Sequence, residues 1–287
     1  KVIPPKWGNF AIVVTSRGCP YNCNFCSPRA GQNPYRMMSA KRAADMIEEL
    51  HNEFGTRVFW VNDLSFNVDC ERTEQFLDEI VERRLKIRMA IDGTRTDLLA
   101  RDRDLIPKMK KAGVFMVNLG VESNSDQELQ FYDKGTSLEK AKETVMLLKM
   151  NEIHPWVFMM IGNWMQDEKD ILDILNYAKE LDPTVAILAV VTPIPGSKFY
   201  NMIMEKGLIE EFDWSLYDLG HPVMRTVGLS RGQILDLTYK VYSGFYKRPK
   251  KIIKHIFLGD VFSRCTYRTA CGMGKLFLRS VHELKEG

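Results

Sequence analysis

Three cysteines, Cys19, Cys23 and Cys26, lie within a span of eight residues in a C-x3-C-x2-C run. Cysteine thiolates bind soft metals and iron–sulfur clusters. A structural zinc ion needs four protein ligands, and the next histidine, His51, stands 25 residues beyond Cys26. Three thiolates on a [4Fe–4S] cube leave one iron without a protein ligand, and chemistry on a bound molecule needs such an open position. The spacing therefore predicts a [4Fe–4S] cluster held by three cysteines.

Two other interpretations of the triplet stay open at this point. One is a zinc ion completed by a distant fourth ligand, and the other is a redox disulfide, which the third cysteine argues against. Outside the triplet, Cys70 precedes an expected helix and is interpreted as a small packed apolar residue. Cys265 and Cys271 are interpreted as free cysteines, because two thiolates do not hold a second cluster.

Short apolar runs alternate along the chain with longer runs of helical periodicity. This alternation predicts an α/β fold with a parallel sheet and helices outside it. The expected strands are residues 11–16, 58–62, 87–91, 115–121, 156–161 and 185–191. The expected helices are residues 40–54, 73–84, 105–112, 138–150, 168–180 and 197–206. Eight such units would close a barrel of roughly 250 residues, so six units predict a partial (β/α)6 TIM-like barrel.

The cysteine run follows the first expected strand. It therefore lies at the carboxyl end of the sheet, where folds of this kind carry their chemistry. From about residue 212 the pattern changes to aromatic and basic residues with helical periodicity and no obvious strands. We expect a barrel at residues 1–207 and a mainly helical C-terminal extension at residues 208–287.

At the cysteine run the sequence resembles the radical S-adenosylmethionine (SAM) superfamily. The signature of that superfamily has this triplet spacing and an aromatic residue before the last cysteine, here Phe25. The resemblance covers residues 10–205 and implies the same partial barrel. It also implies that SAM binds the open iron through its amino and carboxylate groups. One-electron reduction would then cleave SAM to methionine and a 5′-deoxyadenosyl radical, which abstracts hydrogen from a substrate.

The resemblance further implies SAM contacts at the ends of later strands. Asp63, after the second expected strand, would meet the SAM amino group. Arg95, after the third, would pair with the SAM carboxylate, because a guanidinium binds carboxylates with two hydrogen bonds. Glu122 and Ser123 would face the ribose or the carboxylate. The backbone at Gly162 would approach the adenine, because glycine permits close contact.

Within the superfamily the chain resembles the cobalamin-binding branch, in particular the anaerobic magnesium-protoporphyrin IX monomethyl ester cyclases. The likeness continues after the barrel, in residues 212–224. The cobalamin domain of that branch precedes the cysteines, and eighteen residues precede Cys19 here. Cobalamin, where it is used, is therefore expected from a missing or separate domain. Trp214, Tyr217 and His221 are expected near the barrel mouth as substrate contacts.

Composition restricts the class of protein. Forty Lys and Arg against thirty-seven Asp and Glu give a net charge of +3, which is too balanced for a dedicated nucleic-acid binder. No apolar run approaches the ~20 residues of a membrane-spanning helix, and no stretch resembles a signal peptide. A cytoplasmic protein is expected. The basic residues between 247 and 254 are expected to stay in solvent, and contact with an anionic membrane surface is the alternative.

The sequence thus predicts a radical SAM enzyme that abstracts hydrogen from a small, largely apolar substrate, leading to methylation or oxidative cyclisation. Its expected partners are the substrate and a one-electron reductant such as flavodoxin or ferredoxin, with no nucleic acid. Two alternatives are a tRNA-modifying radical SAM enzyme of the methylthiotransferase kind and a non-enzymatic, metal-stabilised interaction module.

Overall fold

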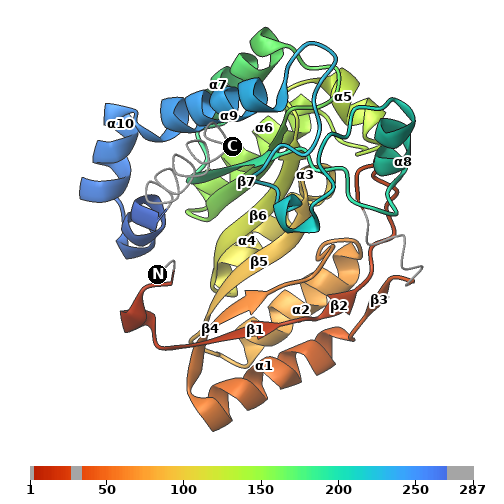
Figure 1. The fold of residues 1–287 in the computed structure, drawn as a ribbon. Helices are drawn as coiled ribbons and strands as arrows, with labels where there is room; N and C mark the ends of the chain where they lie inside the picture. Colours follow the sequence, from red (N-terminus) through yellow and green to blue (C-terminus); the bar gives the residue numbers. More distant parts are fainter. Residues whose placement is uncertain (1–2, 27–33, 270–287) are drawn as a thin grey trace.

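One curved sheet of six parallel strands organises the molecule (Figure 1). The computed structural model describes residues 3–26 and 34–269. The strands are Asn9–Val13 (β1), Thr56–Val61 (β4), Arg88–Arg95 (β5), Val114–Glu122 (β6), His154–Ile161 (β7) and Val185–Val190 (β8). Their order in the sheet is their order in the chain, and every neighbouring pair is parallel. The partial (β/α)6 barrel predicted from the sequence is confirmed.

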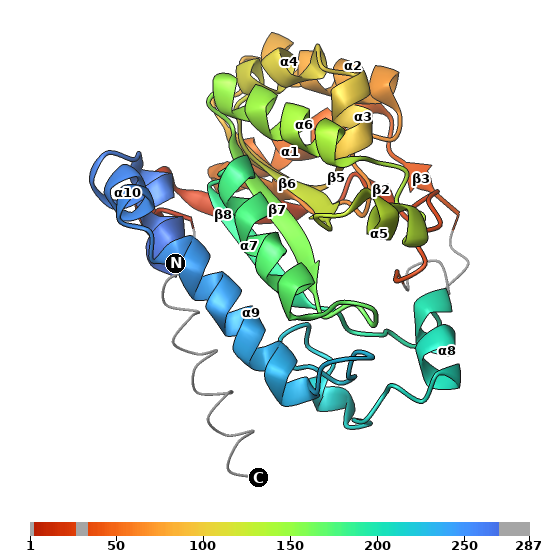
Figure 2. The same ribbon diagram turned by 90° about the horizontal axis from the view of Figure 1, so that it is seen from above.

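Helices connect the strands and cover the outer face of the curve (Figure 2). They are Ala40–Phe54 (α1), Cys70–Glu82 (α2), Thr96–Arg101 (α3), Leu105–Lys111 (α4), Asp126–Phe131 (α5), Leu138–Met150 (α6) and Glu168–Leu181 (α7). Lys198–Glu205 (α8) follows the last strand and lies apart from this layer. A short 3-10 turn, Pro5–Trp7 (η1), precedes β1, and Ser16–Arg17 (β2) pairs with Arg36–Met37 (β3) beside the sheet. The core lies between the sheet and this helical layer.

The bounds of α1 agree with those predicted, because its sequence carries signals at both ends. The Ser39 side chain accepts a hydrogen bond from the backbone of Arg42 at 3.2 Å, which caps the first turn. The face formed by Ala43, Ala44 and Ile47 is fully buried. Gly55 ends the helix with a φ of 61°, a left-handed conformation that glycine adopts without steric cost.

Other bounds differ from those predicted. The first strand ends at Val13, and the chain then turns into β2 rather than continuing to residue 16. Arg95 is the last residue of β5 and does not follow that strand. Cys70 is the first residue of α2, because the Asp69 side chain caps the helix by accepting from the backbone of Arg72 at 2.9 Å. The cap starts the helix before its apolar periodicity begins.

Up to residue 269, where the description ends, the chain after β8 is mainly helical, as predicted. It forms Trp214–Leu216 (η2), Arg231–Tyr246 (α9), Pro249–Ile252 (α10), Ile253–Phe257 (η3) and a helix at residues 261–269. Ile234, Val241, Phe245 and Phe262 from this region belong to the same buried cluster as the barrel. α9 lies along α7 on the outside of the sheet (Figure 2).

Part of this C-terminal region covers the outer edge of β8. The Tyr246 hydroxyl donates to the Ala186 carbonyl at 2.8 Å and accepts from the Ala186 amide at 3.1 Å. Near the other end of the strand, the Val190 amide donates to the Leu219 carbonyl at 2.8 Å. An uncovered edge presents unpaired backbone groups that favour aggregation, so these contacts protect one side of the half-barrel.

The expectation that the whole basic run at 247–254 stays in solvent is wrong. Arg248, Lys251 and Lys254 all bind the Asp182 carboxylate, and Lys251 is only 3% exposed. Burial lowers the pKa of Lys251 to about 8. Burial opposes ionisation of Asp182, but Lys251 and Lys254 outweigh it and lower its pKa to about 2. Among the described helices, none has the length and apolar character needed to cross a membrane.

Candidate functional site

The cysteine loop follows β1 and β2 and is fixed to distant segments through Asn24. The Asn24 amide donates to the Tyr132 carbonyl at 3.0 Å, and its side chain donates to the Phe131 carbonyl at 2.6 Å. The Phe199 amide of α8 donates to the Asn24 carbonyl at 2.9 Å. The ring of Phe25 packs edge-on against Tyr132, with the ring centroids 5.2 Å apart. Elements from across the carboxyl end of the sheet therefore position the loop.

Asp63 holds the turn that leads into the loop. Its carboxylate accepts from the amide and hydroxyl of Thr15, at 2.7 and 2.6 Å. It also accepts from the amide and hydroxyl of Ser16, at 3.0 and 2.8 Å. The side chain is 3% exposed, and these four bonds occupy both oxygens. The geometry gives Asp63 a positioning role in this structure.

Arg95 lies directly against the cysteine loop. Its guanidinium binds Asp97 through two bonds of 3.0 and 3.2 Å and donates to the Lys134 carbonyl. It stacks over the Tyr21 ring at 3.7 Å, and one nitrogen lies 3.9 Å from the Cys23 sulfur. Arg95 therefore places a fixed, buried positive charge beside one of the three cysteines.

Glu122 and Lys134 form a buried ion pair next to Arg95. Their charged atoms are 2.6 Å apart, and each residue is less than a tenth exposed. Burial opposes protonation of Lys134, but Glu122 and Cys23 outweigh it, and the pKa of Lys134 is raised. Gly120 makes room for the pair, because a Cβ there would collide with both charged ends. Glu122 has a φ of 68°, and strained backbone of this kind clusters at functional sites.

The cysteine sulfurs are half-buried in this surrounding. Burial raises the pKa of the Cys23 thiol, and Lys134 and Arg95 oppose that increase. Burial, together with the sulfurs of Cys23 and Cys19, raises the pKa of Cys26 to about 11. The thiols of Cys23 and Cys26 are therefore protonated at neutral pH when no metal is bound, and metal binding would release their protons.

The donor set of the loop fits a cluster ligated by three thiolates. In residues 3–26 and 34–269, no three Cys, His, Asp or Glu side chains surround a point that one metal ion would occupy. The chemistry of three soft sulfurs, with the cations Arg95 and Lys134 alongside, suits a cluster whose thiolates add negative charge.

Ser123 and Gly162 belong to a polar network that the sequence did not predict. The Ser123 hydroxyl donates to Glu128 at 2.5 Å. Glu128 also accepts from the side chains of Asn163, at 3.1 Å, and Gln166, at 3.0 Å. The carbonyl oxygen of the Gln166 side chain accepts from the Gly162 amide at 2.8 Å. This network joins the ends of β6 and β7, and the only sequence signal for it was a polar run after each strand.

Trp214, Tyr217 and His221 are held mainly within their own segment. The Tyr217 hydroxyl donates to the Glu211 carbonyl at 2.8 Å, and its ring lies 4.7 Å from that of Trp214. His221 lies 2.8 Å from Asp218. Two contacts bring this segment toward the carboxyl end of the sheet: the Leu219 bond to β8, and Met224, which shares an apolar cluster with Phe25. The assignment of Trp214, Tyr217 and His221 as substrate contacts stays a prediction.

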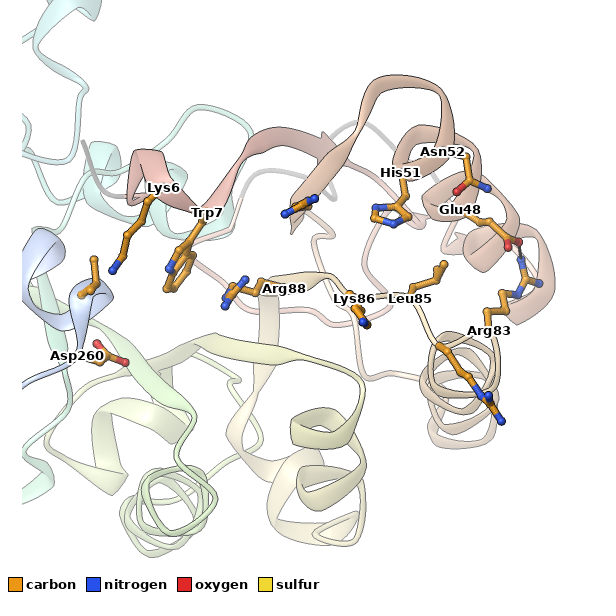
Figure 3. A pocket seen from close by; sticks show the side chains of 13 residues that line it. Lys6, Trp7, Glu48, His51, Asn52, Arg83, Leu85, Lys86, Arg88 and Asp260 are labelled. Carbon is orange, nitrogen blue, oxygen red and sulfur yellow. Dashed lines mark hydrogen bonds and ion pairs between the residues drawn. The ribbon is translucent and has the colours of Figure 1, made fainter.

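A cleft of about 910 Å³ lies at the opposite end of the sheet, near the amino ends of β4 and β5 (Figure 3). Five exposed cations line it, and none forms an ion pair within the described part of the chain: Lys6, Arg57, Arg84, Lys86 and Arg88. The Arg88 guanidinium lies 4.8 Å from the Trp7 ring. The cleft is thus separated from the cysteine loop by the length of the strands.

Comparison with known proteins agrees with the geometry at the carboxyl end. Residues 13–178 match the radical SAM superfamily. The chain is 30% identical to an anaerobic magnesium-protoporphyrin IX monomethyl ester cyclase from Rubrivivax gelatinosus, over 99% of this chain and 52% of that protein. It is also 30% identical to an uncharacterized methyltransferase from Pyrococcus horikoshii, over 86% of this chain and 54% of that protein. The chain therefore spans about half the length of these curated relatives.

A solved structure supports the fold. The radical SAM methyltransferase TsrM from Kitasatospora setae, with cobalamin and a [4Fe–4S] cluster bound, superimposes with a TM-score of 0.68. The match covers 96% of this chain and 61% of that one, at 16% sequence identity. At this identity the likeness concerns the arrangement of strands and helices.

Proposed function

The chain belongs to the radical SAM superfamily, and we propose that it modifies a small, largely apolar substrate by methylation or oxidative cyclisation. Membership makes the chain a radical SAM enzyme rather than a metal-stabilised interaction module. When bound, a [4Fe–4S] cluster supplies the electron that cleaves SAM to a 5′-deoxyadenosyl radical. The observation that carries the proposal is the cysteine loop, fixed at the carboxyl end of the sheet and bordered by Arg95, Glu122 and Lys134.

Cys19, Cys23 and Cys26 are the residues that would hold the cluster. Asp63 and Asn24 fix the two ends of the loop that carries them. Phe25 covers one side through its contact with Tyr132. These contacts restrict the loop before a metal binds, which lowers the conformational entropy lost on binding.

SAM would bind beside the cluster, against the group formed by Arg95, Glu122 and Lys134. This group offers cations for the SAM carboxylate and a carboxylate for its amino group, within a region that excludes most water. The polar network of Ser123, Glu128 and Gln166 would fix the ribose and adenine side. Gly162 has its amide bonded to Gln166, so this loop would meet the adenine through its other backbone groups.

The relatives support the proposed type of reaction. The relatives named above are a cyclase and a methyltransferase, and TsrM was solved with cobalamin bound. We propose that cobalamin, where it is used, comes from a domain outside the half-barrel. A one-electron reductant such as flavodoxin or ferredoxin would supply the electron.

Anaerobic reconstitution tests the proposal. The protein with about four irons and four sulfides should form 5′-deoxyadenosine when SAM and dithionite are added. Cys19→Ala, Cys23→Ala and Cys26→Ala should each lose most of the iron absorbance and all 5′-deoxyadenosine.

Cys70→Ala and Cys265→Ala are the matched controls, because both residues are free cysteines outside the loop. They should keep the full iron content and the rate of SAM cleavage. A triple variant of the loop cysteines that retained a complete cluster would contradict the proposal.

A further inference from the structure

Four side chains on neighbouring strands meet on the inner face of the half-barrel, nearer to the amino ends of the strands than Glu122 is. Trp60 of β4 donates to Asp92 of β5 at 2.5 Å, and Asn118 of β6 donates to the other Asp92 oxygen at 2.8 Å. The rings of Trp60 and Trp156, from β4 and β7, have centroids 6.1 Å apart. Strands lie about 4.8 Å apart, so rings three strands apart meet only across the concave face.

Phe262 packs against this group on the side of the amino ends of the strands. Its ring stacks on Trp156 with a centroid distance of 6.1 Å and an interplanar angle of 16°. Its other neighbours are Trp7, stacked at 5.7 Å, and Phe115, edge-on at 4.7 Å. Phe262 is completely buried. The helix at residues 261–269 therefore closes the amino end of the half-barrel. We call the group that it covers the floor of the inner face; its members are Trp60, Asp92, Asn118 and Trp156.

Apolar side chains of β1 stand exposed above this floor. Phe10 and Ile12 pair in register with Val58 and Trp60 of β4. Partners in a parallel pair point to the same face, and the Phe10 ring also contacts that of Trp60. Phe10 is 44% exposed and Ile12 is 62% exposed, although the sheet curves around them. The inner face is therefore apolar and reachable from solvent.

The floor carries a negative charge with unused hydrogen-bonding capacity. Asp92 is half-buried and forms no ion pair with any described residue. Each of its oxygens accepts one bond from a neutral donor, although a carboxylate oxygen has two acceptor positions. The Asn118 carbonyl oxygen and the Trp156 indole nitrogen are buried without any partner. Buried polar groups that lack partners are rare and call for an explanation.

We propose that Asp92 binds a cationic, hydrogen-bond-donating group of the substrate, such as a protonated amine. The rings of Phe10, Trp60 and Trp156 contact its apolar body. The charge is complementary, and the faces of tryptophan rings attract a cation. Asn118 holds the carboxylate in place and offers its own carbonyl to the same group. This inference rests on the proposed function and adds the class of substrate.

A matched pair of probes tests the inference without knowledge of the substrate. Binding of 2-(1-naphthyl)ethylamine and of 1-naphthylacetate to the cluster-loaded protein is measured anaerobically by calorimetry. The amine should bind at least about tenfold more tightly than the carboxylate. Asp92→Asn should weaken amine binding about tenfold and leave the carboxylate unchanged or tighter.

Asp104→Asn is the control, because Asp104 is exposed, caps no backbone group and forms no ion pair among the described residues. It should bind both probes as the parent protein does. Equal affinity of the parent for both probes, or equal weakening of both by Asp92→Asn, would show that Asp92 only positions Trp60. Amine selectivity without formation of 5′-deoxyadenosine would support this inference and refute the proposed function, so the two failures are distinguishable.

Discussion

Lys134 is a cation that is almost completely buried at the site. Its partner Glu122 is held in a left-handed backbone conformation directly opposite it. Removing one member of a buried pair leaves an uncompensated charge, which costs about 3–5 kcal/mol. Lys134→Met should therefore lower the free energy of unfolding of the apo-protein by that amount in urea. Adding Glu122→Gln should restore most of the loss, while SAM affinity stays low.

Lys142→Met is the matched control for this prediction. Lys142 binds Glu180 on the surface, where both side chains are about half exposed, and such pairs contribute less than about 1 kcal/mol. If Lys134→Met lowered the free energy of unfolding by no more than Lys142→Met does, the Glu122–Lys134 pair would not be an essential part of the site.

Sequence reasoning reached some residues of the site and missed others for a physical reason. The spacing of Cys19, Cys23 and Cys26 is a local pattern, so it could be recognised from the sequence. The anchoring role of Asn24 depends on backbone groups more than a hundred residues away. Glu128 and Asp92 likewise have roles that exist only once separate strand ends meet. Nothing in their local sequence distinguishes them from surface carboxylates.

At the scale of elements, Asp182 at the end of α7 is the point where the C-terminal helices attach. Its pKa is lowered from 3.8 to about 2 in the folded protein. Between pH 4 and 2 the unfolded chain binds more protons, so the free energy of unfolding falls as the pH is lowered. The full contribution is present above about pH 4 and amounts to about 2 kcal/mol. Urea unfolding from pH 2 to 7 should show this slope.

Asp182→Asn should remove most of that slope while keeping the backbone, since asparagine tolerates the left-handed conformation found there. Asp104→Asn is the control, because Asp104 is exposed, caps no backbone group and forms no ion pair among the described residues. Its profile should follow that of the parent. An unchanged slope in Asp182→Asn would contradict this account of the attachment.

Elements with their own end signals were predicted closely, and short ones were not. α1 and α6 carry a serine cap and a clear apolar face, and both have the predicted bounds. α3 and α5 each have six residues, too few to display a helical period. The basic run after α9 was misjudged because its partner Asp182 lies more than sixty residues earlier in the chain.

At the scale of the whole molecule, the C-terminal helices complete the barrel core. Phe262 is fully buried among Trp7, Phe115 and Trp156. Phe262→Ala should therefore lower the free energy of unfolding by about 3–5 kcal/mol. Phe257→Ala, at a side chain that is 71% exposed, should change it by less than about 0.5 kcal/mol. Similar losses in the two variants would show that Phe262 does not contribute to the core.

The strand order of the sheet also bears on how the protein is made. Each strand of the six-stranded sheet pairs with the strand of that sheet that precedes it in the chain. Because translation releases the amino-terminal part first, the strands can therefore pair one after another as they are made. Phe262 leaves the ribosome only after all six strands. The aromatic interior of the nascent half-barrel therefore stays exposed at the amino end until Phe262 is made, and transiently exposed apolar surface of this kind is prone to aggregation.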